Sequence, residues 1–76
     1  MSFEELLDQA CTVAGLPNTA RLQLPTVLSD ETQKMMIRLS PETVGIALKR
    51  AVDAVNNGAT ESVDSLVQEA LREKIQ

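Results

Sequence analysis

The segment at residues 34–42 constrains the fold more than any other part of this chain. It alternates apolar and basic residues and ends in Ser-Pro-Glu. In an extended strand, Met35, Ile37 and Leu39 would point to one face and the intervening side chains to the other. Because Ser40 precedes a proline, its backbone is pushed out of the helical region. The pattern predicts a short strand over residues 34–39.

The same residues also satisfy the pattern of a helix. Ser29 is a favourable N-cap residue, and the acidic Asp30 and Glu31 would follow it in the first turn. Apolar or partly apolar side chains then recur at helical spacing, at Thr32, Met35, Met36 and Leu39. The sequence therefore leaves a helix over residues 30–39 as the alternative.

Composition limits the classes of function that this chain can have. A chain of 76 residues with 43% hydrophobic content is a single small unit, and it buries only about 60% of its unfolded surface, so we expect a second copy to assist folding. Histidine is absent and Cys11 is the only cysteine, which excludes Ser-His and Cys-His catalysis, histidine metal sites and an internal disulfide. We expect no enzyme activity and no cofactor, and Cys11 to be a buried apolar residue.

The charges divide the chain at residue 33. The net charge of −4 arises entirely in residues 1–33, whereas the acidic and basic residues of 34–76 balance. We therefore predict an acidic N-terminal arm over residues 1–33, free to contact a protein partner, and a neutral domain over residues 34–76. The N-terminus has no basic start of a secretory signal, and no apolar run approaches the ~20 residues that span a bilayer. We expect a cytoplasmic protein that does not enter membranes.

Local signals place three helices. Ser2 and Glu5 have the spacing of a capping box, which predicts a helix over residues 2–14. Two prolines and little periodicity predict a linker or loop over residues 16–28. Pro41 at a first helical position begins a helix that Gly58 would end, and the last helix begins near residue 60 or 62 and extends to residue 75.

Residues 34–76 resemble the ribbon-helix-helix family of small dimeric repressors and antitoxin-type regulators. The resemblance rests on the alternating strand ending at Pro41-Glu42, on the helix that follows it, and on Gly58 leading into the run from Ser62 to Glu73. It implies a mainly α fold in which one short strand pairs with its counterpart across a dimer.

The resemblance implies sequence-specific binding of double-stranded DNA by a homodimer. An unpaired strand would form an antiparallel pair with the same strand of a second copy, and the resulting two-stranded ribbon would enter the major groove. Lys34 and Arg38 would then donate to guanine or phosphate, and Met36 would contact a thymine methyl group. Backbone N–H groups near Thr60 and Ser62 would hold a phosphate.

The alternative is an all-α, four-helix bundle-like small domain. Its helices would lie near residues 2–14, 30–39, 41–55 and 60–75. Such a domain would act as a protein–protein interaction module, an adaptor without DNA binding. The net negative charge and the single aromatic residue, Phe3, are consistent with such an interaction module.

Overall fold

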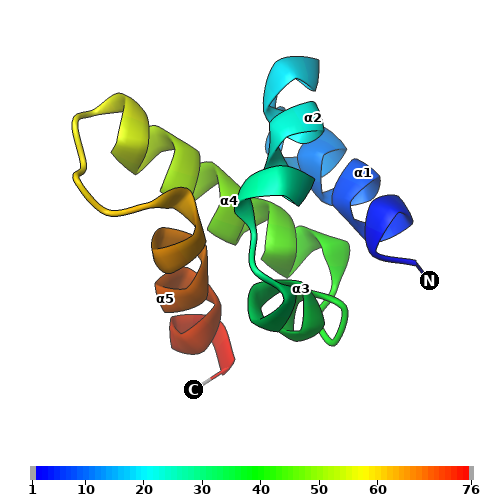
Figure 1. The fold of residues 1–76 in the computed structure, drawn as a ribbon. Coiled ribbons are helices and arrows are strands. Elements are labelled where there is room, and N and C mark those ends of the chain that lie inside the picture. Colours follow the sequence, from blue (N-terminus) through cyan, green and yellow to red (C-terminus); the bar gives the residue numbers. More distant parts are fainter. Residues whose placement is uncertain (1, 76) are drawn as a thin grey trace.

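The computed structural model describes the backbone of residues 2–75 and the side chains of residues 2–73. These residues form five helices and no strand (Figure 1). The helices are α1 (Phe3–Ala14), α2 (Asn18–Val27), α3 (Asp30–Met36), α4 (Pro41–Asn56) and α5 (Val63–Ile75). The chain is therefore mainly α, as in the all-α alternative, and residue 76 of the predicted domain lies outside the described part.

The predicted boundaries of α1 and α4 are confirmed by their caps. The Ser2 hydroxyl accepts a hydrogen bond from the Glu5 N–H at 3.3 Å, and Gly15 ends α1 in the left-handed region with φ 69°. At α4, the Ser40 hydroxyl accepts from the Thr43 N–H at 3.3 Å. Gly58 has φ 94°, so a glycine provides the positive φ after α4.

The strand predicted over residues 34–39 is wrong. The Ser29 hydroxyl accepts from the Thr32 N–H at 3.2 Å and starts α3, and Thr32 and Met36, one helical turn apart, are both fully buried. Ser40 takes the extended backbone that the following proline imposes, with ψ 154°, whereas Ile37 is in the helical region with ψ −10°. Pro41 therefore restricts the backbone of the residue before it and does not prevent residues 30–36 from forming a helix.

The loop predicted over residues 16–28 is also wrong, because residues 18–27 form α2. Pro25 lies in the last turn of this helix, so the one helical hydrogen bond that it removes, to the carbonyl of Arg21, lies close to the end of the element. Leu24 is the only buried residue of α2. A helix with one buried residue has almost no apolar periodicity from which it could be predicted.

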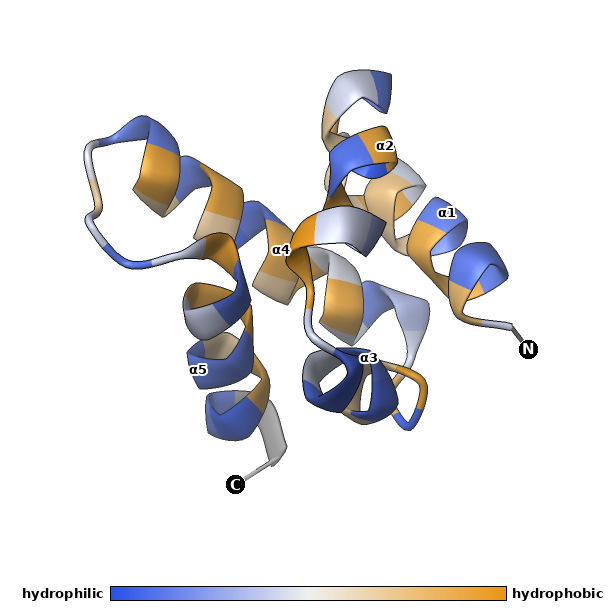
Figure 2. Cartoon of the chain, in the orientation of Figure 1, coloured by the Kyte–Doolittle hydropathy of each residue, from blue (hydrophilic) through white to orange (hydrophobic). Residues whose placement is uncertain are grey.

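The core is built around α4, which crosses the centre of the molecule with α1 on one side and α5 on the other (Figure 1). Apolar segments of these helices face one another, and hydrophilic segments lie on the outer turns of α4 and α5 (Figure 2). The fully enclosed apolar residues include Ala10 of α1, Leu48 of α4 and Leu71 of α5. The same cluster contains residues of α1 and α2, so apolar side chains from the predicted arm pack into the core.

Gly45 permits the close approach of α1 and α4. A Cβ atom at this position would lie 2.7 Å from the backbone carbonyl oxygen of Ala10 and 3.6 Å from the backbone N of Ala14. The obstacle is backbone, which cannot turn aside as a flexible side chain does. Glycine at position 45 therefore sets the distance between the two helices at their crossing.

We expect Gly45→Ala to destabilise the protein by about 2 kcal/mol or more, because the new methyl group must push α1 away from α4. In most helices the same substitution increases stability, since alanine is favoured over glycine inside a helix by about 1 kcal/mol. Urea unfolding followed by circular dichroism measures the change. Gly15→Ala is the control: a Cβ there meets no atom within 4 Å, so only the backbone strain remains. A stability equal to or above that of the wild type for Gly45→Ala would contradict the argument.

Candidate functional site

An apolar groove lies between α2 and the C-terminal half of α4 and has a volume of about 320 Å³. One wall comes from α2, through Ala20 and Val27, and the other from α4, through Val52 and Val55. Val63, at the start of α5, also lines the groove. Among the described side chains, none that lines the groove is charged.

Two aliphatic side chains of the groove are open to solvent. Val27 is 48% exposed and Val55 is 38% exposed, and they come from opposite walls. Gln23 and Asn56, also exposed, add an amide group to each wall. The groove thus offers apolar surface with a few neutral hydrogen-bonding groups, which is the usual composition of a recognition site and provides no nucleophile or acid–base pair.

A polar network fixes the part of the groove where Val63 lies. Asp64 accepts a hydrogen bond from the backbone N–H of Ser29 at 2.9 Å and another from the hydroxyl of Thr32 at 2.6 Å. Ser29 follows the end of α2 by two residues, and Asp64 adjoins Val63. The network therefore holds the end of α2 and the start of α5 at a fixed separation.

The Thr32 hydroxyl is the centre of this network and is fully buried. It uses its single proton to bond Asp64, and it accepts from the Gln68 amide at 2.8 Å. Ser29 Oγ lies 3.0 Å from Thr32 Oγ1, and because the threonine proton is already committed, the serine is the donor. One donor and two acceptor positions are thus all occupied, which is the full capacity of a hydroxyl.

Hydrogen bonds lower the pKa of Asp64 below its ordinary value. Partial burial acts in the opposite direction and raises the pKa, but the N–H of Ser29 and the hydroxyl of Thr32 stabilise the carboxylate more. No charged side chain contributes to this shift. The carboxylate is therefore ionised at neutral pH and is a structural acceptor.

The structure does not bring the predicted DNA-binding residues onto one ribbon. Met36, predicted to contact a base, is fully buried in the core. Lys34 and Arg38 are exposed, on α3 and on the turn after it. Thr60 and Ser62 are exposed before α5, and the Ser62 hydroxyl accepts from the Ser65 N–H at 3.2 Å, so it is a helix cap.

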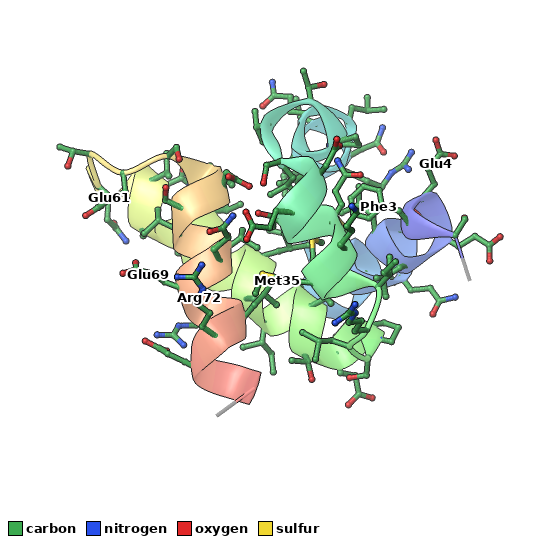
Figure 3. The ribbon with its side chains drawn as sticks, turned by 60° about the horizontal axis from the view of Figure 1, so that its bottom comes forward. Phe3, Glu4, Met35, Glu61, Glu69 and Arg72 are labelled. Atoms are coloured by element: carbon green, nitrogen blue, oxygen red, sulfur yellow. The ribbon has the colours of Figure 1, made fainter. Side chains whose placement is uncertain are left out.

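The three other side chains of the predicted strand are divided between core and solvent. Met35 and Leu39 are half-buried against the core, as predicted for the inward face, whereas Ile37 is 52% exposed. Figure 3 shows Met35 near the middle of the molecule, in contrast to Glu61 at its edge. A strand would have kept all three on one face, and the helix followed by a turn separates them.

Cys11 is buried, as predicted, and lies in the core. Burial raises the pKa of its thiol, and the positive charge of Arg21 offsets this only in part. Within the described side chains, no three metal-ligating residues gather closely enough to hold a metal ion. None of the described helices has the length and apolar character needed to span a bilayer.

No protein-family model matches this chain, and neither a curated protein nor a solved structure is significantly similar to it. The sequence signal that could have located the groove was weak, because its walls come from a helix with no clear periodicity and from the far end of another. Val52 and Val55 continue the helical spacing of the apolar residues at 44, 47, 48 and 51, which by itself indicates one face of a helix. Nothing in the sequence placed α2 beside them.

We expect Asp64→Asn to reduce the free energy of unfolding by about 1–2 kcal/mol at pH 7, because a neutral amide accepts the bonds of Ser29 and Thr32 less strongly. A lowered pKa in the folded state stabilises the fold above the unfolded pKa of about 4 and stops doing so as pH falls through the folded pKa. The difference between the two proteins should therefore shrink below about pH 4.

Urea unfolding at pH 7 and pH 3 measures this difference. Asp53→Asn is the matched control, because Asp53 is exposed and pairs only with Lys49 at 3.9 Å, so its replacement should change stability by less than about 0.5 kcal/mol. An Asp64→Asn deficit that is the same at both pH values would show that the carboxylate charge does not stabilise the network.

Proposed function

We propose that this protein is a protein–protein interaction module that binds an amphipathic helix of another protein in the groove between α2 and α4. The observation that carries the proposal is the pair of exposed valines, Val27 and Val55, on opposite walls of a groove without charged lining. A groove between two helices is elongated along them, which suits a helix that inserts apolar side chains spaced by three and four residues.

The charges around the groove favour a partner helix with basic flanks. Arg21, the only basic residue of α2, is turned towards Asp8 of α1, 3.6 Å away. Lys49 of α4 is paired with Asp53, and Glu61 precedes Val63 of the groove. With a net charge of −4 for the whole chain, electrostatic steering favours lysine or arginine outside the apolar stripe of the partner.

DNA binding is the competing function, and the structure lacks the strand on which that prediction rested. The ribbon that would enter the major groove requires a strand, and residues 34–36 are helical. Lys34 and Arg38 remain exposed basic residues, but α3 also carries Asp30 and Glu31 in its first turn. These carboxylates would face the same phosphates that the basic residues are meant to neutralise.

The groove can be tested with labelled, designed amphipathic peptides that share one aliphatic stripe and carry either lysine or glutamate outside it. Fluorescence anisotropy should show saturable binding of the lysine-flanked peptide and weaker binding of the glutamate-flanked one. Val55→Asp should weaken binding of the lysine-flanked peptide at least about tenfold, because it places a charge in the apolar wall.

Ile46→Asp is the matched control on the same helix. Ile46 is 46% exposed, and it lies about two and a half helical turns before Val55, on the opposite face of α4. Its replacement should leave peptide affinity within about twofold of the wild type. The proposal fails if the two variants weaken binding equally, or if neither peptide binds the wild type at about 100 µM, near the weak limit of specific recognition.

We expect the wild-type protein not to retard double-stranded DNA at physiological ionic strength, and replacement of both Lys34 and Arg38 by alanine to change nothing. A gel-shift series across salt concentrations measures both. A complex that weakens steeply with salt, and that the double variant loses, would contradict this expectation and restore DNA binding as the function.

A further inference from the structure

We propose that α2 is a hinged flap that opens as a unit while α1, α4 and α5 stay folded, and that this opening controls access to the groove. The proposal concerns the free chain, and it is measured without any partner. It extends the proposed function, because α2 forms one whole wall of the groove.

The sequence of α2 gives it little stability of its own. The N-cap residue, Pro17, offers no side-chain hydrogen bond to the first turn. Pro25 has no N–H, so the carbonyl of Arg21 lacks its normal helical donor. Asparagine, threonine and valine at both ends are weak helix formers, and ten residues is below the length at which an isolated helix persists in water.

Packing compensates for this weakness only slightly. Leu24 is the only α2 side chain that is buried, whereas Leu22 and Val27 are 63% and 48% exposed. The groove itself occupies space that tight packing of α2 on α4 would have filled. The one ion pair that leaves α2, between Arg21 and Asp8, joins groups that are 37% and 64% exposed, so solvent weakens it.

Both ends of α2 are anchored. Leu16, before the helix, is half-buried against the core, and its N–H bonds the Cys11 carbonyl at 3.0 Å. Leu28, after the helix, is 4% exposed, and its carbonyl accepts from the Gln33 amide at 3.2 Å. Because both flanking segments stay packed, α2 can detach from α4 and pack on it again without disturbing the rest of the core.

Opening would withdraw Leu24 from the core and expose the sides of Val52 and Val63 that face α2. The closed groove, at about 320 Å³, is near the lower limit of small binding sites. An open flap would admit bulkier side chains, and closure over them would bury Leu24 again. Segments that move on binding are drawn from the least stable parts of a fold, and α2 meets that description.

Amide hydrogen exchange of the full-length, ¹⁵N-labelled protein tests the flap. Amides within α2 that have helical partners should show protection factors at least about a hundredfold lower than those of the buried centre of α4. Their exchange should be nearly independent of low urea concentrations, since little surface is exposed when α2 alone opens. Exchange in α4 should accelerate steeply with urea, because it requires global unfolding.

Val67→Ala separates the flap from global unfolding. Val67 is fully buried in α5 and does not line the groove, so this variant should accelerate exchange in α4 about tenfold by lowering global stability. If α2 opens alone, its amides should keep their wild-type rates. Equal acceleration of α2 and α4, or equal urea dependence in the wild type, would overturn the proposal and leave the groove with a rigid wall.

Discussion

The hydroxyl of Thr32 is the constraint on which the arrangement of α3, α5 and the groove depends. A buried hydroxyl without partners is costly, and this one has all of its hydrogen-bonding capacity used by Ser29, Asp64 and Gln68. The partners come from opposite halves of the sequence. The network can close only when α3 is a helix capped by Ser29 and when α5 begins beside it, so it fixes both elements and the separation of Val27 from Val63.

The groove exists because the two sides of α4 are not equally occupied. α1 approaches closely at Gly45, and α5 buries Val67 and Leu71 on the other side. The surface near the C-terminal end of α4 is left for α2 to cover, and Leu24 is the only residue that α2 buries. A chain of this size has few large apolar residues, with Phe3 its only aromatic one. The strip is consequently covered without being filled, which leaves surface for another molecule.

The parts of the fold that follow from local chemistry could be predicted from the sequence. Ser2, Ser40 and Gly58 determine helix ends through contacts a few residues away, and the corresponding boundaries were right. For α3 the local signals left two choices: Ser29 marks a helix start, as in the predicted alternative, but the side chains of residues 34–39 satisfy both periodicities. The contact that accompanies the helix, from Thr32 to Asp64, lies 32 residues away in sequence and could not be predicted, and neither could α2. The groove could not be predicted for the same reason, because its two walls come from helices that are far apart in the sequence.

The change from strand to helix also removes the strand-pairing argument for a dimer. A lone strand must find another strand for its backbone groups, whereas a helix satisfies its own. A single copy exposes 4737 Å², against about 4,600 Å² expected for a compact monomer of this mass. Its radius of gyration is 10.9 Å, against about 11.4 Å for a typical domain of this length. One copy is thus already compact, and it leaves Val27 and Val55 of the groove exposed.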